Sequence, residues 1–267
     1  MHSLTWTQLY AAVDDLRTGI FSWRLSQFLA LQDIKQRYRR STLGPIWLTL
    51  SSAIQMFTMS FVSSFLFHTS VVRSLPFVCA GLLFWGLITQ MINEGATLFV
   101  SSSQFLTQIK CPQTVFLMQT AWRNLFVVAH NAVVYIIIAI VLVVIPGPSI
   151  ILWPLGLVLV MICVSWMALI SAVVSARYRD VPLIIQNILG IVFWFTPLMY
   201  FPEQLGSKRF IADYNPLTHM IALVRDPLLG GAPTLNDWLT VLAVTIVGWI
   251  GTFLFFARFR ARVVYWL

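Results

Sequence analysis

Residues 124–174 read NLFVVAHNAVVYIIIAIVLVVIPGPSIILWPLGLVLVMICVSWMALISAVV, and this stretch decides the fold. It contains no Asp, Glu, Lys or Arg, and Pro146-Gly147-Pro148 divides it into two apolar runs. Each run exceeds the roughly 20 residues that a helix needs to cross a bilayer. We therefore predict two membrane-spanning helices, about 124–145 and 150–174, joined by a tight hairpin.

The composition extends this prediction to the whole chain of 267 residues. Hydrophobic residues make up 59% of it and charged residues 10%, with a mean hydropathy of +0.84. A soluble domain carries about 25% charged residues, so most of this surface must face lipid. The predicted fold class is an all-α integral membrane protein with six transmembrane helices. The predicted spans are about 46–67, 76–100, 124–145, 150–174, 182–200 and 239–256.

Two segments outside the spans also carry helical patterns. In residues 4–29 an apolar stripe recurs at three- and four-residue steps, which predicts an amphipathic helix in the membrane interface; packing on another domain is the alternative. The stripe consists of Trp6, Leu9, Val13, Leu16, Ile20 and Trp23. Between the fifth and sixth spans, Asn215-Pro216 is a helix-start signal in a segment too short to cross. We interpret it as re-entrant or interfacial.

The distribution of charge predicts the orientation. The net charge is +8, from 17 Lys and Arg against 9 Asp and Glu. Nucleic acid binding could explain this excess, but cytoplasmic loops of membrane proteins also collect Lys and Arg. With six spans and a cytoplasmic N-terminus, 13 of the 17 basic residues fall inside. We therefore expect both termini in the cytoplasm, no nucleic acid partner, and two regions: 1–45, an interfacial helix with a basic linker, and 46–267, the transmembrane domain.

Several polar residues within the spans are candidates for function. Ser51, Gln55 and Thr58 share one helix face, which suits either a polar pathway or helix–helix packing. Glu94 is a functional candidate because membrane carboxylates are costly, although solvation near the interface would also explain it. His130-Asn131 suggests either an intramembrane site or, as the preferred interpretation, a buried hydrogen-bonded pair.

The motifs of common enzymes do not occur. The chain has no Gly-Lys pair and therefore no phosphate-binding P-loop, and it has no zinc-protease or serine-hydrolase signature. Cys79, Cys111 and Cys163 lack metal-ligand spacing. We expect no catalytic residue, metal or cofactor in this chain.

The run Asp33-Ile34-Lys35-Gln36-Arg37-Tyr38-Arg39-Arg40-Ser41-Thr42-Leu43-Gly44-Pro45-Ile46-Trp47 closely resembles the N-terminal signature of ABC-2-type polysaccharide export permeases. These are the Wzm-like exporters of O-antigen, capsule and teichoic acid. Further similar segments, in the same order, are Ile109–Pro112, Arg177–Val181, Phe193–Pro197 and Asn215-Pro216. Cys111 departs from the family, which more often has a bulky apolar residue there.

The resemblance implies an N-terminal interfacial helix, six spans and periplasmic re-entrant helices after the fifth span. It also implies a homodimer in the bacterial inner membrane that pairs with two copies of a separate P-loop subunit, which binds ATP and Mg. The implied substrate is a lipid-linked polysaccharide, of the undecaprenyl-linked O-antigen type.

We expect flat aromatic side chains near the family motifs to line the path of the sugar chain, although aromatic belts at the interfaces are the alternative for each. The predicted channel residues are Tyr38, Trp47, Phe57, Trp85, Trp194 and Phe195. Arg37, Arg39 and Arg40 would attract the pyrophosphate at the inner headgroup level, unless they only anchor the topology.

Coupling to the ATPase must pass through cytoplasmic elements. The candidates are the N-terminal helix, the predicted loop Ser101–Arg123 with Lys110, and the turn Arg177–Asp180 with Arg177, Arg179 and Asp180. Arg179 and Asp180 could instead pair to cap neighbouring helices.

Three other interpretations remain. The first is an ABC-2 permease for a drug or lipid. The second is an intramembrane enzyme that uses His130 and Glu94, although these lie on different spans and no nucleophile accompanies them. The third is a secondary transporter, which the shortage of membrane-embedded charges disfavours.

Overall fold

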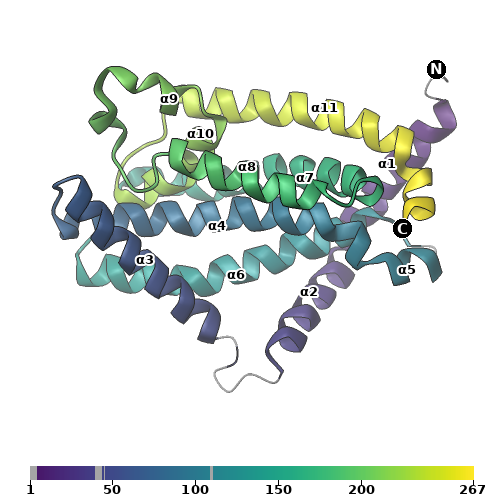
Figure 1. Cartoon of the computed structure of the whole chain (residues 1–267), viewed down its shortest axis with the longest axis horizontal. Helices are drawn as coiled ribbons and strands as arrows, with labels where there is room; N and C mark the ends of the chain where they lie inside the picture. The colour runs from purple at the N-terminus through teal and green to yellow at the C-terminus, as the bar shows by residue number, and fades with distance from the viewer. Residues whose placement is uncertain (1–4, 40–43, 45, 109–110) are drawn as a thin grey trace.

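The computed structural model describes residues 5–39, 44, 46–108 and 111–267, and every regular element among them is a helix (Figure 1). The all-α prediction is thus confirmed. In chain order the α-helices are α1 (Trp6–Phe21), α2 (Trp23–Tyr38), α3 (Ile46–Leu66), α4 (Val71–Ser101), α5 (Ser103–Gln108), α6 (Thr114–Val141), α7 (Trp153–Arg177), α8 (Val181–Phe195), α9 (Phe210–Asp213), α10 (Pro216–Arg225) and α11 (Leu235–Trp266). Short 3-10 helices are η1 (Pro148–Leu152), η2 (Pro202–Lys208) and η3 (Asp226–Leu229).

Five helical segments of the described chain are long and apolar enough to cross a membrane: α3, α4, α6, η1 with α7, and α11. The predicted fifth span, 182–200, is shorter than expected. α8 ends at Phe195 because Thr196 precedes Pro197 and has an extended backbone, as the residue before a proline favours. At 1.5 Å per residue its 15 residues extend about 22 Å.

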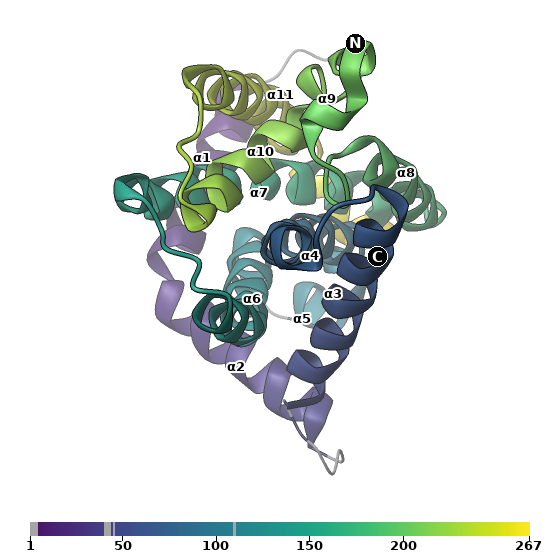
Figure 2. The same cartoon turned by 90° about the vertical axis from the view of Figure 1, so that its left-hand side faces the viewer.

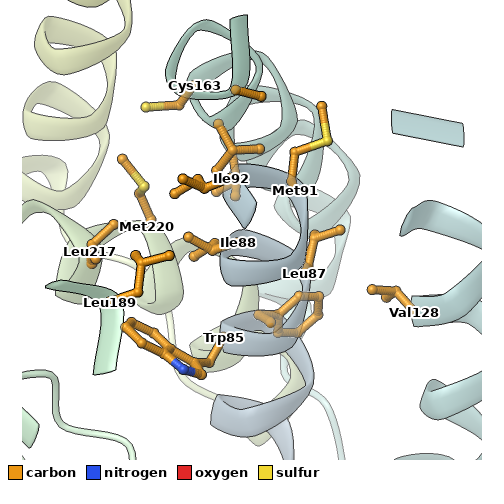
Figure 3. Packing of buried hydrophobic residues seen from close by; sticks show 14 of the residues in the cluster. Trp85, Leu87, Ile88, Met91, Ile92, Val128, Cys163, Leu189, Leu217 and Met220 are labelled. Carbon is orange, nitrogen blue, oxygen red and sulfur yellow. The ribbon is translucent and has the colours of Figure 1, made fainter. Parts of the chain in front are cut away.

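α4 and α7 form the centre of the bundle. Leu87, Ile88 and Met91 of α4 lie among side chains from neighbouring helices, including Cys163 of α7 and Met220 of α10 (Figure 3). The two central helices approach closely where Gly95 faces Ala168, since a Cβ on Gly95 would lie 2.5 Å from the Ala168 Cβ. Small residues allow this close approach of backbones in membrane proteins.

α1 and α2 form an arm across one end of the bundle (Figure 1). The single helix predicted over 4–29 is wrong in extent, because the chain leaves helical geometry at Ser22 and the second helix continues to Tyr38. The face that packs on the bundle consists of small or polar residues: Ala12, Asp15, Gly19, Ser26 and Ala30. The apolar stripe points outward, with Trp6, Val13, Ile20 and Trp23 exposed.

Three predicted boundaries also change. α6 begins at Thr114 rather than about 124, because Asp15 of the arm binds the first N–H groups of this helix. The predicted loop Ser101–Arg123 is therefore much shorter. α4 starts at Val71 and keeps Pro76 inside the helix. α11 is longer at both ends than the predicted span 239–256, because a Thr234–Asp237 capping box starts it and its C-terminal arginines remain helical.

The end of the molecule opposite the arm is closed by short helices. α10 lies between α4, α7 and α11 (Figure 2), and most of its side chains are buried. His219 of α10 is within 2.6 Å of the Asp237 carboxylate on α11 and 2.8 Å of the Asp213 carbonyl. These contacts fix α10 to the start of α11.

Candidate functional site

α3 and α8 present the most exposed aromatic residues of the predicted channel set. Both helices pack on α4 and lie on the same side of the molecule (Figure 2). The exposed fractions are 50% for Trp47, 49% for Phe57, 67% for Trp194 and 50% for Phe195. The structure thus exposes these four predicted residues on two helices that both pack on α4, and we call the outward surfaces of α3 and α8 together the α3–α8 face.

Trp85 lies elsewhere than the other predicted channel residues. It is only 8% exposed, and its ring meets the Phe193 ring edge-on with 5.7 Å between centroids. This contact fixes α8 against α4 inside one chain. Tyr38 ends α2, but its side chain lies outside the described part of the structure.

The polar residues of α3 also point outward. Ser51, Gln55 and Thr58 are exposed, so they do not mediate helix packing within this chain. α3 has the lowest mean hydropathy of the five long helices, 1.3, and the smallest buried share, 17%. Hydroxyl and amide groups are costly in hydrocarbon unless they find partners. The outward surface of α3 therefore suits a protein partner or a polar path better than lipid alone.

Asp15 fastens the arm to the bundle. Its carboxylate is buried and accepts hydrogen bonds from the backbone N–H groups of Gln113 and Thr114, at 3.1 and 2.9 Å. Arg260 of α11 donates to the same carboxylate at 2.6 Å. A carboxylate at a helix N-terminus complements the helix dipole. Asp15 thus joins α1, α6 and α11, a role that the apolar pattern of the arm did not reveal.

A second connection joins the arm to α4 and α6. Arg123 lies 2.7 Å from Asp33 of α2 and 2.9 Å from Glu94 of α4. Asn124 also donates to Glu94, and Arg37 lies 3.8 Å from the other Glu94 oxygen. Arg123 was predicted in a loop and Asp33 was not singled out as a site residue. Their pairing depends on three helices that only the fold brings together.

The remaining basic residues of the predicted headgroup site lie at the end of α2. Arg39 follows this helix and is exposed. Arg40 lies outside the described residues, as does Lys110 of the predicted coupling loop.

The turn after α7 contacts the end of α11. Arg179 donates to the Trp266 carbonyl at 3.3 Å, and the Arg177 guanidinium lies 5.5 Å from the centre of the Trp266 ring. Cationic side chains are favourable at a helix C-terminus. Of the alternative role, helix capping holds for Arg179, which binds the end of α11, whereas Asp180 begins α8 without a side-chain cap and no ion pair joins it to Arg179 in the described part of the chain.

A hollow of about 660 Å³ lies between α1, α5 and the end of α11. Asp14, Gln108 and Arg260 are among its lining residues, together with half-buried Cys111. Burial, followed by the nearby Asp15 carboxylate, raises the pKa of the Cys111 thiol. The hollow thus offers charged and hydrogen-bonding groups at the arm end of the bundle.

The residues of the intramembrane-enzyme interpretation do not form a site. His130 is exposed, and its ring nitrogen hydrogen-bonds to the Phe126 carbonyl, whereas Glu94 binds Arg123 and Asn124. The expected buried His130–Asn131 pair is also wrong, because His130 points outward. Asn131 instead lines a separate cavity between α3, α4 and α6.

The short motifs near α8 and α10 meet in space. The Asn215 side chain caps α10 by accepting from the Leu217 N–H and donates to the Thr196 hydroxyl at 2.9 Å. At the other end of α10, buried Arg225 donates to the Pro197 carbonyl at 2.8 Å. The irregular chain after α8 is therefore held by both ends of α10.

Comparison with known proteins identifies the family. Residues 24–229, from α2 to η3, match the family described as ABC-2 type transporter. The O-antigen export system permease protein RfbA of Klebsiella pneumoniae is 22% identical over 220 residues, which cover 80% of this chain and 83% of that protein. The protein of the same name from Myxococcus xanthus is 22% identical over 196 residues, covering 72% and 75%. Since the family match extends over more than half of its length, this multi-pass membrane protein belongs to the ABC-2 type transporter family.

Proposed function

We propose that the chain is the permease subunit of an ABC transporter that exports an undecaprenyl-linked polysaccharide of the O-antigen type across the bacterial inner membrane. The family match over residues 24–229 carries this proposal, and two relatives named as O-antigen export permeases support it. The transported glycan is long and rich in hydroxyl groups, so its path needs surfaces that do not hold it tightly.

Two copies of the chain would enclose this path with their α3–α8 faces. The aromatic rings of Trp47, Phe57, Trp194 and Phe195 offer flat surfaces over which sugar rings slide. Homodimers of membrane proteins pair by C2 symmetry, so one face serves both copies. Tyr38 would extend the path at the inner end, and Trp85 would support it from behind by holding α8.

ATP and Mg would bind to two copies of a separate P-loop subunit. The movement of those subunits on binding ATP would be transmitted to this chain through contacts on its cytoplasmic side. The hollow beside Cys111, with α5 and Lys110, is one proposed contact. The turn with Arg177, Arg179 and Asp180 is the other. Asp15 joins the arm to the start of α6 and to the end of α11. A movement of the arm would therefore be transmitted to both of these membrane-spanning helices.

Arg37, Arg39 and Arg40 would attract the pyrophosphate of the substrate. Arg37 is 55% exposed despite its long contact with Glu94, so its guanidinium retains free donors. Guanidinium groups bind phosphate oxygens through paired hydrogen bonds.

A sixth crossing by α8 completes the proposed topology. The arm and the end of α11 contact each other through Asp15 and Arg260, so both lie on one side of the membrane. An even number of crossings must separate them, and five long helices leave one to be supplied. Residues 196–199 are buried and would complete the crossing that α8 begins, since irregular backbone at membrane depth must be covered by protein. The excess of positive charge places both termini in the cytoplasm, with the outward stripe of the arm in the inner interface and α9 and α10 re-entrant from the periplasm.

The direct test is to purify the tagged chain from native membranes in mild detergent. A stoichiometric P-loop ATPase, whose hydrolysis a polyprenyl-linked glycan stimulates, is the expected result. A chain that purifies alone under conditions that preserve known membrane complexes would contradict the proposal. Stimulation by a drug or simple lipid, but by no glycan, would reassign the substrate.

The path is tested by replacing Trp47, Phe57, Trp194 and Phe195 together with Ala. Export should be lost while the complex still assembles, because these side chains are exposed in each chain. The matched control replaces four equally exposed apolar residues elsewhere, Leu155, Val158, Val247 and Ile250, and should export normally. Normal export by the first variant would remove the α3–α8 face from the path.

A further inference from the structure

A polar cavity of about 230 Å³ lies between α3, α4 and α6 of a single chain, and its lining includes the exposed side chains of Gln55 and Gln90. Its lining comes from the middle of α4 and the middle of α6, so it lies at the depth of the hydrocarbon core. The polar side chains that surround it are Ser52, Gln55, Thr89, Gln90 and Asn131. Leu82, Val127 and Val128 supply an apolar wall, and the lining contains no charged residue.

One buried polar atom of this cavity has no hydrogen-bond partner among the described residues. The Oδ1 atom of Asn131 is buried and accepts no hydrogen bond from the described chain. Thr89, by contrast, donates to the Trp85 carbonyl at 2.9 Å and is satisfied. A buried amide without a partner costs free energy, most of all in a membrane where water is scarce. The cavity therefore favours an occupant that both donates and accepts hydrogen bonds.

The chemistry of the lining restricts that occupant. A phosphate or carboxylate would find no cation, and a hydrocarbon chain would leave the buried Asn131 oxygen unpaired. An uncharged ring bearing hydroxyl groups meets both conditions, since amide side chains donate and accept and Leu82, Val127 and Val128 offer an apolar wall. We propose that the cavity is a binding site for one neutral sugar unit, distinct from the α3–α8 face. This inference rests on the proposed export of a glycan.

Gly86 gives direct access to the cavity. It lines the space, and a Cβ placed on it would meet no atom within 4 Å. Gly86→Cys therefore puts a thiol into the cavity without a clash. Gly251→Cys on α11 is the matched control, because Gly251 is also helical, exposed and free of neighbours. Both are made in a Cys111→Ser background, in which Cys79 and Cys163 stay buried.

The experiment measures alkylation of the two variants by a small neutral thiosulfonate, in a detergent without a sugar headgroup. Glucose at millimolar concentration is the probe. We expect Gly86→Cys to react and glucose to slow its reaction several-fold, with no effect on Gly251→Cys. If Gly86→Cys reacts but glucose does not slow the reaction, the cavity holds only water. If Gly86→Cys does not react, the cavity is closed to small molecules. Either result overturns the proposal. Protection by phosphatidylglycerol vesicles, but not by glucose, would assign the site to a lipid headgroup and also overturn it.

A filling variant separates this inference from the proposed function. Gly86→Leu should insert into the empty space and fold, because leucine favours helix more than glycine does. Gly251→Leu is its control. Export that falls several-fold in Gly86→Leu, with normal assembly with the ATPase, supports the sugar site. Normal export in Gly86→Leu overturns the site and leaves the exporter function intact, whereas wild-type protein that exports no glycan refutes the function itself.

Discussion

α3 and α4 are consecutive helices joined by a short turn, yet they have opposite surroundings. Within the most apolar part of each, 72% of α4 is buried in the chain and only 17% of α3. Their mean hydropathies, 1.9 and 1.3, run against the simple expectation that the helix facing lipid is the more apolar one. The difference indicates that α4 holds the chain together and that the outward surface of α3 serves another purpose.

The largest effect is expected where α4 meets α7. Gly95→Leu would force a side chain into the Ala168 backbone, and overpacking against backbone atoms should destabilise by about 3 kcal/mol or more. We expect little folded protein after extraction, measured by size-exclusion chromatography. Gly86→Ala on the same helix meets open space and should keep or raise stability. A monodisperse Gly95→Leu protein would show that the two helices are not tightly packed.

The second-largest effect is expected from removing a buried aromatic side chain on α4, compared with an exposed one on α3. Phe84 of α4 is fully buried, and Phe84→Ala should lower the free energy of unfolding by about 2–3 kcal/mol through lost packing. Phe57→Ala on α3 should change it by less than about 0.5 kcal/mol, as for other exposed positions. Thermal unfolding in detergent compares the two. Equal losses would mean that α3 is packed within its own chain.

The ion pairs that fix the arm to α4 should have an intermediate effect. Arg123→Ala leaves Asp33 without its cation and Glu94 with only the long contact to Arg37, which should cost about 1–3 kcal/mol because the pairs are partly buried. Arg209→Ala is the control, since the Arg209–Asp213 pair is more than half exposed and worth about 0–1 kcal/mol. Similar melting temperatures for the two variants would contradict a structural role for Arg123.

The smallest effect concerns Cys111 beside the Asp15 connection. Because burial and the Asp15 carboxylate raise the pKa of its thiol, a smaller fraction is thiolate at neutral pH than in an ordinary cysteine. Alkylation should be slow at pH 7 and should still be rising with pH above the usual thiol pKa of about 8.5. Labelling of intact protein, followed by mass spectrometry, measures the rate. A plateau reached below that pH would contradict the raised pKa.

The sequence predicted the elements of this fold better than their contacts. Apolar runs marked all five long helices, and Asn215-Pro216 marked the start of α10. The contacts of Asp15 could not be predicted, because its partners Thr114 and Arg260 lie 99 and 245 residues away in the chain. The same applies to the predicted channel aromatics: Trp47 and Trp85 both lie in apolar runs, and only the packing of α4 in the bundle shows that Trp85 is the buried one. Arg123 was wrongly predicted in a loop, because the carboxylates that stabilise it within α6 come from α2 and α4.

Cross-linking between copies in native membranes tests most directly whether the α3–α8 face meets a partner. Single cysteines replace Ile54 on α3, Ile188 on α8, Leu155 on α7 or Val247 on α11, all exposed in one chain, in the Cys111→Ser background. With a short bis-maleimide, we expect covalent dimers from the α3 and α8 positions and monomers from the α7 and α11 positions. Dimers from α7 or α11, with none from α3 and α8, would contradict a path enclosed by the α3–α8 faces of two copies.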